Sequence, residues 1–152
     1  ADILPEFTMK DERYKEITEK IIGAAMKVHS VLGNGFQEVI YQRALALQME
    51  TDGLGFQREC NMIIYYLETQ IGERRVDFFV ENKICVELKA TTKLEPVHFA
   101  QARNYLEDFN VEVGLLINFG TISLEFRRIE NPKFNPFMIN HPSNIILSQK
   151  SL

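Results

Sequence analysis

Apolar residues follow a helical period in the first third of the chain, on one face of a single segment. The positions in this period are Ile17, Ile21, Ile22, Ala25, Val28 and Leu32. Gly33, Asn34 and Gly35 come directly after them and favour a stop, because these residues tolerate positive φ. A second segment of the same kind predicts a helix from about Phe36 to about Thr51, before the sequence DGLG. The two segments predict a packed pair of helices.

The pattern changes to short strand-like runs between Phe56 and Leu88. These runs are rich in Ile, Val, Tyr and Phe, and they read FQREC, MIIYYL, RRVDFFV and ICVEL. The polar breaks ETQIGE and ENK separate the last three of them. Such runs with short breaks are typical of successive antiparallel strands, so we expect an antiparallel meander.

A third helix and two strands are predicted after the meander. Pro96 suits the first turn of a helix, and the apolar positions that continue it are Phe99, Ala102, Tyr105, Leu106 and Phe109. The run VGLLINFG is almost continuously apolar, which is typical of a strand covered on both faces. Apolar and polar residues alternate in LEFRRI, which predicts a last strand. The predicted fold class is therefore α/β, an α+β arrangement with one mixed sheet.

Three stretches of the chain are expected to differ in role. Residues 1–8, ADILPEFT, lack periodicity and precede Met9, a plausible native start, so we interpret them as an expression remnant. Residues 9–130 form the predicted domain, which is long enough for one core. Residues 131–152 contain three prolines and are predicted to be an extended tail, packed on the domain or on a partner.

Composition narrows the classes of function. Lys and Arg total 17 against 21 Asp and Glu, so the net charge is −4 and any contact with nucleic acid must be local. No stretch is apolar enough for a membrane span or a secretory signal, so we expect a cytoplasmic protein without membrane contact. Cys60 and Cys85 lie in separate strand-like runs, which favours reduced, buried thiols.

Three charged residues stand inside the predicted strands, where unpaired charge is normally avoided. Side chains alternate along a strand, so Glu87 and Lys89 of ICVELK share one face. If the connection ENK centres on Asn82, Asp77 on the preceding strand lies opposite Glu87. The sequence thus predicts two carboxylates and one ammonium group on a single sheet face.

Two carboxylates held close together repel unless a positive charge lies between them, and a hard divalent cation prefers oxygen ligands. Mg²⁺, or Mn²⁺, is therefore the expected cofactor. A lysine beside it can orient or deprotonate a water while the metal withdraws charge from a phosphate oxygen, which is phosphodiester hydrolysis. The alternative is an ordinary cross-strand charge network of Asp77, Glu87, Lys89 and Arg75.

Asp77, followed by ELK at 87–89, resembles the PD-(D/E)XK nuclease superfamily, although Val76 stands at the place of its proline. The resemblance implies a restriction-endonuclease-like α-β-β-β-α-β core with an extra N-terminal helix. GFQEVIY at 35–41 matches the signature of the bacterial GxxExxY protein family, which is assigned to this superfamily. The similarity extends over nearly the whole predicted domain.

The resemblance implies roles for individual residues. Asp77, Glu87 and the Leu88 carbonyl would bind Mg²⁺, and Lys89 would stand beside the water. Glu38 would face the metal directly or through water. The alternative for Glu38 is a glutamate near a helix start, where the helix dipole favours negative charge.

Gln101 and Tyr105 resemble the Gln-x-x-x-Tyr motif of RecB-type nucleases. By this resemblance Gln101 would orient Lys89 or the water, and Tyr105 would contact the phosphate. His98 is three residues before Gln101 and could join them. The alternatives are a core aromatic for Tyr105 and a residue of the first helical turn at the surface for His98.

Two functions from different classes follow. The first is a metal-dependent nuclease that hydrolyses DNA phosphodiester bonds with a Mg-activated water, for which six residues are the catalytic candidates: Glu38, Asp77, Glu87, Lys89, Gln101 and Tyr105. The second is a catalytically silent nuclease-fold module that binds DNA, another nucleic acid or a protein partner. A homodimer fits the first function, because one small acidic domain has little area to hold a duplex. Local positive charge could come from Arg74, Arg75, Lys93, Arg103, Arg127 and Arg128.

Overall fold

A computed structural model describes residues 3–138 and 145–146, with side chains from residue 14 to residue 138. The three helices are α1 (Ile3–Leu32), α2 (Glu38–Thr51) and α3 (Pro96–Asp108). The strands are β1 (Phe56–Tyr66), β2 (Thr69–Val80), β3 (Ile84–Lys89), β4 (Val113–Asn118), β5 (Glu125–Glu130) and β6 (Ile145–Ile146). They form one mixed sheet in the order β5-β4-β3-β2-β1-β6. The predicted α-β-β-β-α-β core with an extra helix before it is confirmed.

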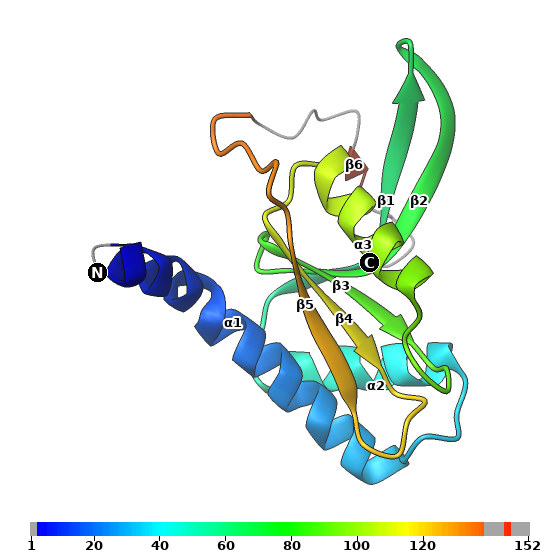
Figure 1. The fold of residues 1–152 in the computed structure, drawn as a ribbon. Coiled ribbons are helices and arrows are strands. Elements are labelled where there is room, and N and C mark those ends of the chain that lie inside the picture. The colour runs from blue at the N-terminus through cyan, green and yellow to red at the C-terminus, as the bar shows by residue number, and fades with distance from the viewer. Residues whose placement is uncertain (1–2, 139–144, 147–152) are drawn as a thin grey trace.

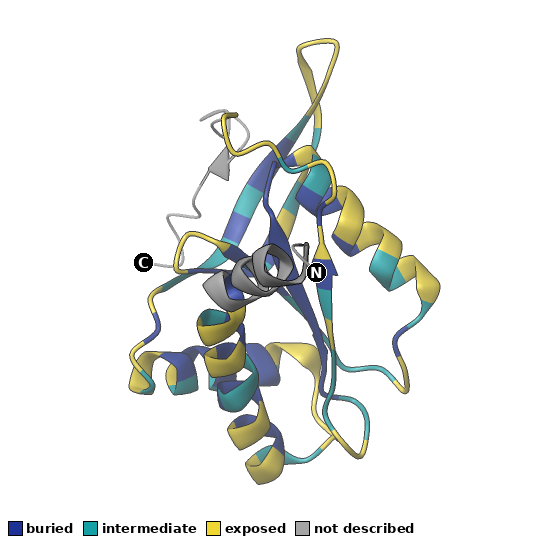
Figure 2. Ribbon diagram, turned by 60° about the vertical axis from the view of Figure 1, so that its left-hand side comes forward, coloured by how far each residue is buried: buried dark blue, intermediate teal, exposed yellow. Residues whose placement is uncertain are grey.

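Helices cover the two faces of the sheet, with α1 and α2 on one face and α3 on the other (Figure 1). Each face has its own core. Phe78, Val86 and Leu88 pack with α1 and α2, whereas Val76 and Cys85 pack with α3. The buried residues therefore concentrate along the central strands (Figure 2).

The meander of β1, β2 and β3 is antiparallel, as predicted. Pairing of Phe78 with Val86 and of Val80 with Ile84 centres the connection on Asn82, so the predicted register is also confirmed. Asn82 has a φ of 55°, a value that asparagine tolerates better than most residues. Helix α3 then carries the chain across to β4, which lies parallel to β3 and antiparallel to β5.

Helix α1 begins at Ile3, earlier than the apolar period indicates, and it runs through the predicted boundary at residue 9. The tail is only partly within the described residues. Its first part packs on the domain, because Asn110 Nδ2 donates to the carbonyl groups of Asn135 and Met138. Strand β6 pairs with β1, and residues 139–144 and 147–152 lie outside the description.

Two further expectations from composition can be compared with the structure. Cys60 and Cys85 are both free and buried, as predicted, and burial raises the pKa of Cys60 to about 11. Across the described part of the chain, every helix is too short or too polar to span a bilayer.

Candidate active site

Strands β2 and β3 separate next to the predicted acids. Their backbone pairing ends at Phe78 and Val86, and beyond this point the Leu88 N–H donates to Asp77 Oδ2 at 2.8 Å. A side-chain carboxylate thus takes the place of a backbone acceptor. Because the N–H and C=O of one strand residue point to the same edge, the Leu88 carbonyl also faces β2.

Side chains of β2 alternate between the two faces of the sheet, but this alternation slips by one residue at Asp77. Phe78 packs in the core under α1 and α2, whereas Val76, two residues earlier, packs under α3. In the neighbouring β1, Glu59 has a φ of 51° between the paired positions Arg58 and Cys60. Such an irregularity re-aims side chains, as a β-bulge does.

Asp77 is directed toward α2 by this slip. Gln42 of α2 donates from Nε2 to Asp77 Oδ1 at 2.7 Å, and Gln42 Oε1 in turn accepts from Arg58 Nη2 at 3.2 Å. Each carboxylate oxygen of Asp77 therefore has a donor, one from α2 and one from the Leu88 backbone.

Glu87 lies on the α3 side, where Arg74 of β2 holds it. The prediction that Asp77 and Glu87 share one sheet face is therefore wrong, because the slip turns Asp77 toward α2. Asp77 still lies near enough for its charge to raise the pKa of Glu87. Arg74 Nη2 lies 3.1 Å from Glu87 Oε1 and 3.4 Å from Oε2. Both side chains are largely shielded, with 28% of Arg74 and 13% of Glu87 exposed. The charge network proposed as an alternative named Arg75, but the slip at Asp77 places Arg74 on this side. Arg75 instead lies 3.9 Å from Glu59.

The start of α2 is fixed by Tyr41, the last residue of GFQEVIY. Its hydroxyl donates to the Gly33 carbonyl at 2.6 Å and accepts from the Phe36 N–H at 3.1 Å. Its ring stacks on Phe119, with 4.6 Å between the ring centroids. These contacts hold the loop before α2, and hence the first residue of the helix, Glu38.

Three carboxyl groups share Lys89, the last residue of β3, as a neighbouring cation. Desolvation raises the pKa of each of these groups, and the Lys89 ammonium acts in the opposite direction on all three; they are Glu38, Asp77 and Glu87. The negative charge of Asp77 further raises the pKa values of Glu38 and Glu87. The three carboxyl groups therefore lie close enough to Lys89 for its charge to act on each of them, although Glu38 itself is exposed.

Comparison with known proteins bears on this arrangement. The profile of the PD-(D/E)XK nuclease superfamily matches residues 15–129. The chain belongs to this superfamily. A solved structure described as "Crystal structure of SSO0001" is similar in fold, with a TM-score of 0.51 and 18% sequence identity, and the match covers 81% of this chain and 62% of that one. No curated protein gave a significant match.

The contacts of Gln101 and Tyr105, the Gln-x-x-x-Tyr pair, differ in this structure from those predicted. The Gln101 side chain is exposed, and it is the Gln101 carbonyl that binds Arg74, at 3.0 Å from Nη1. Tyr105 is only 2% exposed, and its hydroxyl finds no hydrogen-bond partner among the described residues. The Arg74 guanidinium carbon lies 5.0 Å from the centre of the Tyr105 ring. A phosphate contact by Tyr105 stays a prediction.

His98 belongs to a capping box at the start of α3. Its Nδ1 accepts from the Glu95 N–H at 2.9 Å, and the Glu95 side chain accepts from the His98 N–H in return. This pairing satisfies N–H groups that a helix start leaves open. His98 therefore caps the first turn of α3, which agrees with its alternative interpretation as a residue of the first helical turn.

The donor atoms of the site fit a hard divalent cation in kind, because they are carboxylate and carbonyl oxygens. They are not gathered as a ready cluster. Within residues 14–138, no three His, Cys, Asp or Glu side chains stand close enough together to hold a metal ion. The reason is visible in the contacts: Asp77 is held by Gln42 and Leu88, and Glu87 by Arg74.

Asn118, the last residue of β4, and Gly120, two residues after it, hold the loop that follows Lys89. Asn118 is fully buried, and its Oδ1 accepts from the Thr91 N–H at 2.9 Å while its Nδ2 donates to the Thr91 carbonyl at 3.1 Å. A Cβ atom on Gly120 would overlap the Thr91 carbonyl oxygen. The motif INFG thus fixes the end of β3 through close backbone contact.

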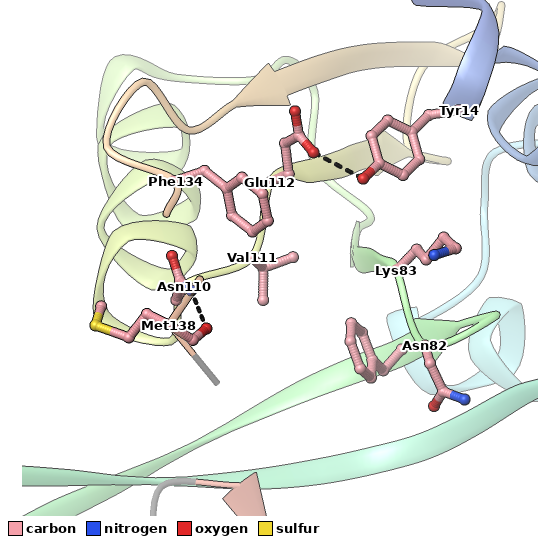
Figure 3. A pocket seen from close by; sticks show the side chains of 9 residues that line it. Tyr14, Asn82, Lys83, Asn110, Val111, Glu112, Phe134 and Met138 are labelled. Atoms are coloured by element: carbon pink, nitrogen blue, oxygen red, sulfur yellow. Dashed lines mark hydrogen bonds between the residues drawn. The ribbon is translucent and has the colours of Figure 1, made fainter. Parts of the chain in front are cut away.

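A cavity of about 270 Å³ lies at the opposite end of β3 and contains none of the predicted site residues (Figure 3). Asn82 and Lys83 of the β2–β3 connection line it, together with Asn110 from the loop after α3. On its wall Tyr14 donates to Glu112 Oε1 at 2.7 Å. The pocket is therefore separate from the acidic site.

Sequence reasoning missed Gln42 and the role of Arg74. A signal for Gln42 was present, because it is four residues after Glu38 and so shares its helix face. No comparable signal existed for Arg74, since strict alternation assigns it to the face opposite Glu87.

Proposed function

We propose that this chain is a metal-dependent nuclease that hydrolyses DNA phosphodiester bonds, and that it belongs to the GxxExxY branch of its superfamily. One observation carries the proposal. Asp77 sits at the point where β2 and β3 separate, bonded to the backbone of the Glu87-Leu88-Lys89 segment. This bond supports a site in which Asp77 of β2 acts together with the segment of β3 that carries Glu87 and Lys89.

The residues have distinct roles in this proposal. Asp77, Glu87 and the Leu88 carbonyl would hold Mg²⁺ or Mn²⁺, with Glu38 adding a contact directly or through water. The bound ion would act as a Lewis acid on the phosphate. Lys89 would hold and orient the attacking water, a role supported by the effect of its charge, which lowers the pKa of all three carboxyl groups.

The GxxExxY assignment is supported by what the motif does. Tyr41 ties the loop at Gly33 and Phe36 to the fold, and one turn earlier on the same helix stands Glu38. A motif that fixes the helix start positions an acid near the sheet end. Dimerisation, which would extend the surface for a duplex, remains part of the proposal.

A silent binding module is the second candidate, and the Arg74–Glu87 pair favours it. An ion pair with 13% exposure at Glu87 already compensates a carboxylate that a metal would otherwise use. In that case the chain would bind DNA, another nucleic acid or a protein without cleaving it.

Metal titration combined with cleavage assays separates the two candidates. The wild type is titrated with Mn²⁺ by calorimetry and tested on single- and double-stranded DNA, beside Asp77→Asn and the control Asp108→Asn, an exposed acid at the end of α3. We expect the control to match the wild type and Asp77→Asn to lose metal binding and cleavage together. A wild type that binds no divalent ion and cleaves no substrate would instead establish the binding module.

A further inference from the structure

Arg74 is the centre of four contacts beside the candidate metal ligands. Its Nη2 faces both oxygens of Glu87, at 3.1 and 3.4 Å, and its Nη1 donates to the Gln101 carbonyl at 3.0 Å. Its guanidinium also lies over the ring of Tyr105. Strand β3, through Glu87, and helix α3, through Gln101 and Tyr105, thus hold this cation between them.

We infer that, in the metal-free protein, Arg74 pairs with Glu87 at the place where a divalent cation would bind. Metal binding then frees the Arg74 guanidinium to hold the phosphate of the substrate. The inference rests on the proposed function and adds a residue to it. Arg74 would then be a catalytic residue of the substrate complex and a competitor of the metal in the free protein.

The first argument concerns charge. Glu87 is largely desolvated, and a carboxylate in such a place needs a cation. Arg74 now supplies that cation. A divalent ion that binds Glu87 supplies more charge at the same oxygens, so the two cations cannot both keep their best geometry there. Metal affinity must therefore include the loss of the Arg74 contact.

The second argument concerns where the guanidinium goes. The contacts with Gln101 and Tyr105 do not depend on Glu87, so Arg74 can give up Glu87 and still remain at the site. A guanidinium presents several N–H donors in a plane that matches the oxygens of a phosphate. A lysine in this position would be a point charge without that match.

Metal affinity is the first readout. Mn²⁺ is titrated calorimetrically at pH 8 into the wild type, Arg74→Met and Arg74→Gln, with circular dichroism to verify folding. We expect both variants to bind Mn²⁺ about tenfold more tightly, the equivalent of one lost hydrogen bond to a charged group. Arg75→Met is the matched control, because it removes the same charge one residue away on the side of Glu59, and we expect it to leave the affinity unchanged.

DNA affinity is the second readout. Fluorescence anisotropy of a labelled duplex oligonucleotide is measured with Mn²⁺ in a Lys89→Met background, which limits cleavage. Adding Arg74→Met is expected to weaken DNA binding about tenfold although the metal binds more tightly, and Arg74→Lys to restore part of the loss. A residue that only supports the fold would not shift the two affinities in opposite directions.

The outcomes separate this inference from the proposed function. If the wild type binds Mn²⁺ and Arg74→Met or Arg74→Gln binds it no more tightly, the inference is wrong and the nuclease proposal stands. Equal gains in Arg74→Met and Arg75→Met would also overturn it, because they would indicate a general charge effect. If neither the wild type nor the Arg74 variants bind Mn²⁺ at millimolar concentration, both proposals fail.

Discussion

The two ends of β3 differ in how their polar groups are satisfied. At the Ile84 end the buried polar side chains pair with one another and with the backbone, as Tyr14 does with Glu112 and Asn110 with the tail. At the Lys89 end, desolvation raises the pKa of three carboxyl groups around a single lysine. Carboxyl groups with perturbed pKa values cluster at functional sites in proteins. The contrast therefore favours the Lys89 end of β3 as the catalytic end.

The largest effect should come from removing the ammonium at the active end of the strand. Lys89→Met is expected to lower the rate of DNA cleavage about a thousandfold, the typical loss of a group that moves or holds a proton. Lys83→Met changes an exposed lysine of the turn just before the other end of β3; it is the control and should cleave like the wild type. Equal rates for both variants would remove the functional difference between the two ends.

The second-largest effect should come from the close backbone contact between Gly120 and Thr91 beside the site. Gly120→Ala should destabilise the fold by about 3 kcal/mol, because the added Cβ would overlap the backbone N and O of Thr91, which Asn118 holds by two hydrogen bonds. Gly23→Ala in α1 meets no atom within 4 Å and should stabilise by up to about 1 kcal/mol. Urea unfolding curves measure both. A Gly120→Ala protein as stable as the wild type would contradict the packing described.

The smallest expected effect is the difference in stability between two Tyr→Phe variants, each at a buried tyrosine. Tyr14→Phe removes a hydrogen bond to Glu112 and should lower the free energy of unfolding by about 1 to 2 kcal/mol without changing cleavage. Tyr105→Phe removes a hydroxyl that has no partner in the described residues, so stability should change by less than about 0.5 kcal/mol. Thermal unfolding resolves the difference, and a reversed order would mean that the Tyr105 hydroxyl is bonded in solution.

Much of the fold could be predicted from periodicity and loop length. The connection ENK has an odd number of residues, and this parity alone centres the β2–β3 register on Asn82, as observed. The start of α1 could not be predicted, because residues 3–13 carry no clear apolar period and their helix continues that of the packed segment.

The candidate site was harder to predict because one backbone irregularity changes several side chains. Glu59 adopts a positive φ, which nothing in a glutamate signals. On the neighbouring strand the slip at Asp77 turns this acid toward Gln42 of α2 and brings Arg74 to the side of Glu87. Spacing in the sequence predicts which residues are near one another, but not which donor each carboxylate takes.

The bond from Leu88 N–H to Asp77 Oδ2 makes one amide proton an internal probe of the site. Its nuclear magnetic resonance shift depends on a side-chain carboxylate rather than on a neighbouring strand. A cation that takes electron density from Asp77 will therefore move this resonance before any bond in a substrate is broken. Occupancy of the cation site can thus be followed in a single amide peak, without turnover.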